Sequence, residues 1–184
     1  MATSPVSPSR RRQARATAAP HFPDPHHDHG RCASDALDRA ASLCESRRER
    51  LTAIRRRVLE IVWRGHEPVG AYAILEAMQR ELGKVVAPPT VYRALDFLQA
   101  QGLVHRVESL NAYVGCHDPE TPHSVQFMIC RSCKTAVELH DRAIADAIAA
   151  AAGAAGFTPA ESVVELSGLC GRCARSHGGS PAPG

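Results

Sequence analysis

The sequence predicts an α+β protein in which an N-terminal winged helix-turn-helix unit is followed by a small C-terminal α/β unit. Three observations predict this fold. Successive helical patterns fill the first part of the chain, and two short strand patterns follow the last helix directly. A strand–strand–helix–strand pattern comes next. Two Cys-x2-Cys pairs stand at the ends of strands in this second part.

The composition is that of a globular protein with thin cores. The 184 residues are 44% hydrophobic and 22% charged, but only 4% aromatic. A chain of this length forms one domain or two small ones, and small domains are often stabilised by a structural metal. The seven cysteines and ten histidines can supply its ligands. The formal net charge of +3, with arginines concentrated before residue 60, is compatible with nucleic acid.

Several features predict a cytoplasmic protein without a membrane partner. The arginine-rich start is not followed by the apolar core of a signal peptide. The alanine-rich run 143–155 is too short and too weakly apolar to span a bilayer. In a reducing cytoplasm, paired Cys-x2-Cys units favour zinc over disulfides.

The chain divides into five expected segments. Both ends are rich in small and turn-forming residues and are expected to be disordered. The arginines of the N-terminal end form either a solvated tail or an arm that follows DNA. The expected segments are a tail at 1–33, a winged-helix unit at 34–115, a hinge at 116–123, a metal-binding unit at 124–175 and a tail at 176–184.

The first three helices of the winged-helix unit follow from periodicity and caps. Ser34 is expected to cap a helix that ends near Arg47 and carries Cys44 on its apolar stripe. Thr52 is expected to cap a second helix that ends before Gly65. A third is expected over residues 70–82. The inward positions expected on the second and third helices include Ile54, Val58, Ile61, Val62, Ile74, Leu75, Met78 and Leu82.

The fourth helix is the best delimited. Two prolines precede Thr90, which is expected to cap or open the helix, and Gly102 ends it. A buried stripe with helical spacing leaves Tyr92 and Arg93 exposed near its start. Strands are expected on either side of a turn near 109–111, as the wing. In this fold such a helix enters the major groove of DNA. An ordinary exposed Tyr–Arg pair is the alternative reading of these two residues.

In the second part of the chain, the first and third expected strands each end at a cysteine pair. Strands are expected at 124–130, 135–140 and 161–170, with a helix at 141–152 that turns Ile144 and Ile148 inward and is broken by Gly153 and Gly156. The resulting four cysteines suit a closed tetrahedral zinc site of structural type. Disulfides, idle thiols or an iron–sulfur centre are the alternatives. The four cysteines are Cys130, Cys133, Cys170 and Cys173.

A second set of possible ligands is more scattered. It comprises His105, Cys116, His123 and Glu138. One thiolate, two imidazoles and one carboxylate suit zinc, are tolerable for iron(II) or cobalt, and are poor for magnesium or calcium. Spacing alone does not single out these four, and His105 and Glu138 taken singly read as surface residues. Cys116 is the exception, because a lone thiol between two units is an unusual packing cysteine.

Four stretches carry a resemblance to a known family. They are RLTAIRRRVLEIV, PPTVYRALDFLQAQGLVHRVESLNAYVGC, PHSVQFMICRSC and GLCGRC. The chain resembles the ferric uptake regulator family of metal-dependent repressors over about residues 35–175, and is most similar to its zinc uptake regulator branch. Iron-sensing relatives usually carry a histidine-rich run before the first cysteine pair, where this chain has His123 alone. It also lacks the usual proline after Thr52.

The resemblance implies a homodimer that binds double-stranded operator DNA, with two zinc ions per subunit. It implies a structural zinc on the four cysteines, a C-terminal unit that dimerises, and a regulatory zinc on His105, Cys116, His123 and Glu138. The implied DNA-binding residues are Thr90, Tyr92, Arg93 and Arg55. The implied function is a zinc-responsive, sequence-specific DNA-binding repressor of zinc uptake and homeostasis genes, with zinc as co-repressor.

Other functions stay open at this point. An iron- or peroxide-sensing repressor of the same family is the nearest alternative. A zinc enzyme requires an open coordination position and a general base, neither of which the second ligand set offers obviously. A zinc-ribbon module without DNA contact is the third possibility. The sequence therefore predicts a protein that is not an enzyme and has no small organic substrate.

Overall fold

A computed structural model describes residues 22–23, 29–120 and 125–176. Most of both expected tails, and His123, lie outside these residues. The helices are α1 (His29–Ser46), α2 (Ala53–Val62), α3 (Ala71–Leu82), α4 (Pro88–Ala100), η1 (Glu108–Leu110), α5 (Arg142–Ala154) and α6 (Gly171–Ser176). The strands are β1 (Val69–Gly70), β2 (Val104–Val107), β3 (Ala112–Gly115), β4 (Val125–Cys130), β5 (Ala136–Glu138) and β6 (Val163–Gly168).

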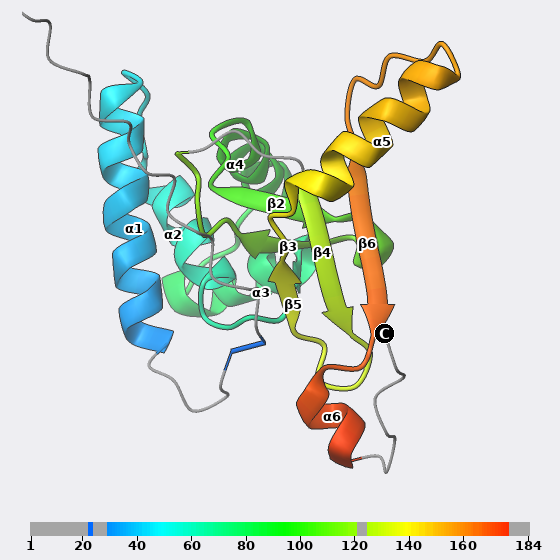
Figure 1. Ribbon diagram of the computed structural model, residues 1–184. Helices are drawn as coiled ribbons and strands as arrows, with labels where there is room; N and C mark the ends of the chain where they lie inside the picture. Colours follow the sequence, from blue (N-terminus) through cyan, green and yellow to red (C-terminus); the bar gives the residue numbers. More distant parts are fainter. Residues whose placement is uncertain (1–21, 24–28, 121–124, 177–184) are drawn as a thin grey trace, which may run out of the picture.

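The winged-helix unit predicted from the sequence is confirmed. Helices α2, α3 and α4 pack against one another, α1 lies against α2, and the sheet follows α4 (Figure 1). The wing has three strands rather than the expected two, because Val69 and Gly70 pair with β3. Residues at helical spacing fill the core. The fully buried members include Val58, Leu59, Ile74, Met78, Val91, Leu95 and Leu98.

Several predicted positions in this unit are corrected. Helix α1 begins at His29, so Ser34 lies inside the helix and does not cap it. Ile54 is 44% exposed and Leu82 is 45% exposed, although periodicity placed both inward. Thr52 does cap α2, and its side chain accepts a hydrogen bond from the Arg55 N–H. Cys44 is buried as expected.

The start of α4 also differs from the prediction. The helix begins at Pro88 after Ala87, so both prolines occupy its first turn. Proline suits this place because the first amides of a helix have no partner within it. Thr90 therefore lies inside the first turn instead of capping the helix, and its N–H donates to the Ala87 carbonyl at 2.9 Å.

The C-terminal unit is a three-stranded sheet with β4 at its centre. Strand β5 is antiparallel to β4, and β6 is parallel to β4 on its other side. Parallel neighbours need a crossover connection, and α5 supplies it. Gly153 lies within α5 and does not end it. No residue of α5 is fully buried, but Ile144 and Ile148 are half-buried on a helix whose other side is exposed, in agreement with their predicted orientation.

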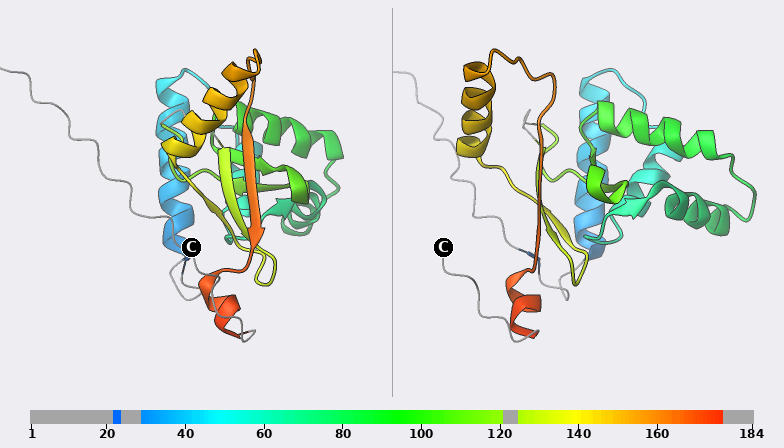
Figure 2. Two further views of the ribbon diagram at one scale, coloured as in Figure 1. Left: turned by 45° about the vertical axis from the view of Figure 1, so that its right-hand side comes forward. Right: turned by 90° about the vertical axis from the view of Figure 1, so that its right-hand side faces the viewer.

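The two units meet over a small junction. Val107 of the wing packs with Phe127, Ile129 and Ala136 of the C-terminal sheet. The Ala136 N–H also donates to the His66 carbonyl at 3.0 Å. Helix α5 lies on the face of the C-terminal sheet that is turned away from the winged helix (Figure 2). Among the described residues, no helix is both long and apolar enough to cross a membrane.

Candidate metal centres

The two cysteine pairs meet at one end of the C-terminal sheet. Strand β4 ends at Cys130, and the parallel register places Gly168 beside it, so Cys170 follows close by. A tight turn after Cys130 returns the chain toward β5, with Lys134 in the left-handed region at φ 61. The Lys134 N–H donates to the Cys130 carbonyl at 2.9 Å. Cys173 lies on the first turn of α6.

The sulfur atoms of these four cysteines are spaced for a metal and not for disulfides. All four Sγ atoms lie within 4.8 Å of one another, and the Cys133 and Cys170 Sγ atoms are 3.9 Å apart. Tetrahedral zinc with Zn–S bonds of about 2.3 Å sets its sulfurs about 3.8 Å apart, whereas a disulfide needs about 2.05 Å. The geometry therefore fits a closed four-thiolate site.

Backbone amides favour thiolate at this site. Burial raises the pKa of Cys130, but the N–H groups of Cys170, Cys133 and Ser132 outweigh it and lower that pKa to about 6. The Cys170 N–H lies 3.4 Å from the Cys130 Sγ. Burial opposes ionisation of Cys133 as well, but hydrogen bonding to Thr135 lowers its pKa. Cys170 differs, because burial raises its pKa to about 11.

Three residues of the second predicted set meet at the junction of the two units. His105 comes from β2, Cys116 directly follows β3, and Glu138 ends β5. Their ligand atoms lie within 4.8 Å of one another. The His105 Nε2 is 3.0 Å from Glu138 Oε1, and the Glu138 side chain is only 4% exposed. The predicted fourth member, His123, lies outside the described residues.

Glu138 is oriented by two neighbouring groups, the His117 backbone and the His140 imidazole. The His117 N–H donates to Glu138 Oε2 at 3.4 Å, and His140 Nε2 lies 3.6 Å from the same oxygen. These contacts hold one carboxylate oxygen and direct the other to His105. Groups that orient ligands in this way tune metal sites.

The Cys116 thiol needs a cation to ionise. Burial first, and the Glu138 carboxylate second, raise the pKa of Cys116 to about 12. Because metal ligands must be deprotonated, a bound cation has to displace this proton. Nitrogen, sulfur and oxygen donors together suit a metal ion of intermediate softness such as zinc. They suit magnesium and calcium poorly, since these ions prefer oxygen ligands alone.

The predicted DNA-contact residues lie on α2 and the first turns of α4. Tyr92 is 41% exposed, Arg93 is exposed and Thr90 is half-buried. Arg55 is held in place by two contacts. Its guanidinium carbon lies 3.4 Å from the centre of the Phe97 ring on α4, and Nη1 donates to the Arg50 carbonyl at 2.5 Å.

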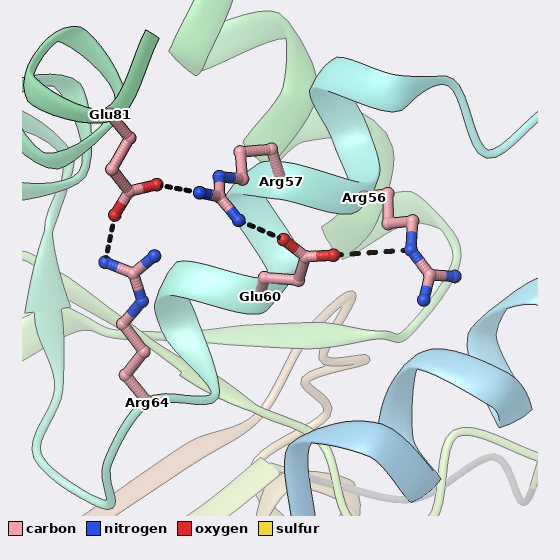
Figure 3. A network of polar contacts seen from close by, with 5 residues as sticks. All are labelled: Arg56, Arg57, Glu60, Arg64 and Glu81. Carbon is pink, nitrogen blue, oxygen red and sulfur yellow. Dashed lines mark hydrogen bonds and ion pairs between the residues drawn. The ribbon is translucent and has the colours of Figure 1, made fainter. Parts of the chain in front are cut away.

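A charged network joins α2 to the end of α3 (Figure 3). Glu60 pairs with Arg56 at 3.3 Å and with Arg57 at 2.7 Å. Glu81 of α3 pairs with Arg57 and with Arg64, the latter at 2.5 Å. Helical spacing from Glu60 is a signal that sequence reasoning missed. The contacts of Glu81 depend on the tertiary fold and leave no such signal.

Together these features define a metal-binding winged-helix protein, with a four-cysteine centre in one unit and a mixed-ligand centre where the two units meet. The model of the ferric uptake regulator family matches residues 46–167. The chain belongs to the ferric uptake regulator family.

Relatives of known name lie within this family. The Zinc uptake regulation protein of Escherichia coli strain K12 is 39% identical over 140 residues, which cover 76% of this chain and 81% of the relative. A zinc uptake regulator solved in complex with zinc and DNA has a TM-score of 0.75 at 35% identity, over 79% of this chain and 97% of that one. The crystal structure of holo XcZur has a TM-score of 0.71 at 46% identity, and the match covers 78% of this chain and 99% of that one.

Proposed function

We propose that the protein is a zinc-responsive, sequence-specific DNA-binding repressor of zinc uptake and homeostasis genes, with zinc as its co-repressor. One observation carries the proposal. The mixed-ligand centre takes His105 from the wing and Glu138 from the C-terminal sheet, so its occupancy depends on the relative position of the two units. The similarity to a regulator solved with zinc and DNA supports the choice of metal and partner.

Cys130, Cys133, Cys170 and Cys173 are the proposed ligands of a structural zinc. When bound, zinc supplies a closed tetrahedral centre that accepts four thiolates without strain. The cysteines then tie the end of β4 to the segment after β6. The 3.9 Å separation of Cys133 and Cys170 sulfurs supports this role.

His105, Cys116 and Glu138, with His123, are the proposed ligands of a second, regulatory zinc. Two zinc ions per subunit follow. A set of four protein ligands leaves no position for a substrate, which supports a regulatory role over a catalytic one. These residues bind the ion together only when wing and C-terminal sheet are positioned as described, so metal binding selects that arrangement.

The proposed oligomer is a homodimer formed through the C-terminal unit. Strand β6 has a neighbour on one side only in the described sheet, and open edges of this kind are usually covered. Apolar side chains are exposed beside that edge and after α5, and a second copy would cover them. They are Phe157 at 64%, Val163 at 46%, Leu166 at 48% and Leu169 at 45% exposure.

The dimer explains how metal controls DNA affinity. A twofold dimer presents two α4 helices to major grooves about one helical turn apart, and that separation depends on the angle between units. Thr90, Tyr92, Arg93 and Arg55 are the proposed contacts. By linkage, operator DNA tightens zinc binding by the same factor as zinc tightens DNA binding, typically about 5–150-fold.

A gel shift on the protein's own upstream DNA tests the proposal. We expect half-maximal binding to depend on buffered free zinc, with little effect of iron(II) or manganese at matched occupancy. Arg93→Ala should lower specific affinity about 5–150-fold. Arg131→Ala, an exposed arginine of the C-terminal unit, is the control and should bind as wild type. A stronger response to iron(II) than to zinc would identify an iron-sensing sibling instead.

A further inference from the structure

A side chain of the C-terminal sheet holds the wing by its backbone. Glu165 on β6 accepts hydrogen bonds from the Glu108 N–H at 2.6 Å and the Ser109 N–H at 3.0 Å. These amides begin η1, the short helix between β2 and β3. Each Glu165 oxygen therefore takes one of two consecutive N–H groups that lie 57 and 56 residues away in sequence.

The chemistry of this contact is favourable. The first amides of a helical turn have no partner within the turn, and a carboxylate supplies the acceptors. A charged acceptor makes these bonds stronger than neutral ones, and two parallel bonds fix direction as well as distance. The register that pairs Phe127 with Glu165 sets the height of the carboxylate along β6.

Beyond the apolar junction around Val107 and Phe127, the two units are separated on this side. A cleft of about 500 Å³ separates them, lined by Val104, His105 and Arg106 of β2 on one wall and by residues 160–163 on the other. Among the described residues, the most extensive packing between elements occurs within each unit and not between them. The Glu165 contact is thus a discrete polar link between the apolar junction and the cleft.

This link lies close to the mixed-ligand centre. Glu108 is three residues after His105, and Glu165 grips the chain where β2 ends. Fixing the end of β2 fixes the height of His105 opposite Glu138 on β5. Unlike the centre itself, the link contains none of the proposed metal ligands.

We propose that Glu165 is a positioning residue that holds the wing in its metal-binding orientation and thereby sets the zinc concentration at which the protein responds. The proposal rests on the proposed function, because it assigns the response point of that same regulatory centre. Apparent metal affinity is proportional to the fraction of molecules in the binding-competent arrangement. A link that makes this arrangement about tenfold more populated therefore raises the apparent affinity about tenfold. Saturating zinc selects the same arrangement without it.

The test compares Glu165→Gln with Glu161→Gln, which removes the same charge from an exposed side chain four residues earlier. Full-length proteins are titrated with cobalt(II) without DNA, using the thiolate-to-cobalt absorption of Cys116 after the four-cysteine centre has been filled with zinc. They are then titrated with buffered zinc in the presence of labelled upstream DNA. Thermal stability and oligomeric state are recorded for each.

We expect Glu165→Gln to shift both metal midpoints about tenfold upward, with an unchanged cobalt spectrum at saturation and near wild-type DNA affinity in excess zinc. Glu165→Asp, which keeps the charge but reaches less far, should give a smaller shift. Glu161→Gln should match wild type.

Unchanged midpoints in Glu165→Gln would overturn the proposal. So would a loss of DNA affinity that excess zinc does not restore, since this would mark a purely structural role. If wild-type DNA binding ignored zinc while the cobalt midpoint still shifted in Glu165→Gln, the proposed function would fail and the positioning role would stand.

Discussion

The Nε2 atom of His105 on the wing lies 3.0 Å from Oε1 of Glu138 on β5, and the two side chains are 12% and 4% exposed. An imidazole and a carboxylate from different units are therefore close enough to bind the same metal ion. Cys116, whose pKa is raised to about 12 by burial and by Glu138, completes the described set once its proton leaves. This arrangement makes Cys116 the most informative position for separating regulation from folding.

Cys116→Ser should abolish the metal response and leave the fold intact. A hydroxyl does not replace a thiolate as a zinc ligand at neutral pH, whereas the four-cysteine centre is untouched. The variant should remain dimeric, retain one zinc per subunit, and bind upstream DNA with an affinity that no longer rises with zinc. Zinc content by mass spectrometry and DNA titrations at two zinc levels measure this.

Cys32→Ser is the matched control, because Cys32 is a half-buried cysteine of α1 outside both centres. It should keep two zinc ions and a normal response. A wild-type zinc response in Cys116→Ser would show that the regulatory ligands are assigned wrongly.

Cys130→Ser should instead damage the C-terminal unit itself. Binding at structural zinc sites contributes roughly 10–16 kcal/mol, which rivals the whole stability of a small domain. Cys130 is fully buried between β4 and the segment after β6, so its loss leaves that end of the sheet unjoined. Size-exclusion chromatography should show loss of the dimer, and circular dichroism should show loss of strand signal. A folded, dimeric Cys130→Ser protein with one zinc fewer would contradict a structural role.

Local patterns predicted the elements that depend on local forces. Val91, Leu95 and Leu98 recur at helical spacing and are all buried, because the spacing alone puts them on one face of α4. The four cysteines could be predicted for a similar reason. Each Cys-x2-Cys pair is formed within one tight turn, so its spacing is visible in the local sequence. The inward assignment of Ile54 and Leu82 was wrong. An apolar stripe on a helix does not show how far along that helix the neighbouring elements extend, and both residues lie near a helix end.

Contacts between distant segments could not be predicted from local patterns. His105, Cys116 and Glu138 come from three elements of two units, and their grouping rested on the family resemblance until the structure brought them together. Glu165 and Glu81 were not identified at all, because their partners are set by the tertiary fold. The two-residue strand β1 was missed because it is too short to show alternation.

Gly115→Ala should destabilise the winged helix next to the regulatory centre. A Cβ at Gly115 would overlap indole atoms of Trp63, including Cζ2 at 2.7 Å. Trp63 is 4% exposed and packed in the core, so it has little room to move. Overpacking of this kind costs about 1–3 kcal/mol, which urea unfolding curves can measure.

Two further variants test the steric cause. Gly70→Ala has no atom within 4 Å of the new Cβ and should change stability far less. Trp63→Phe combined with Gly115→Ala should recover part of the loss in a double-mutant cycle, because the smaller ring makes room. Strict additivity of the two substitutions would rule out a direct clash.

Glu81→Gln should weaken the link between α2 and α3 in a pH-dependent way. Hydrogen bonding to Arg64 first, and the charges of Arg64 and Arg57 next, lower the pKa of Glu81 below its ordinary value of 4.5. A carboxyl whose pKa is lower in the folded state stabilises the fold above its unfolded pKa, and loses that contribution as pH falls through the folded pKa. The variant should therefore be less stable than wild type at pH 7, and the difference should vanish in acid.

Trp63 provides the signal for this measurement, because it is the single tryptophan and lies in the winged-helix core. Its fluorescence should follow urea unfolding of that unit at each pH. Glu76→Gln removes a charge from an exposed position of the same helix and serves as the control. Added salt should also reduce the effect, since the pairs around Glu81 are partly exposed and open to screening. A stability difference that persists unchanged at acid pH would mean that Glu81 acts through packing and not through its charge.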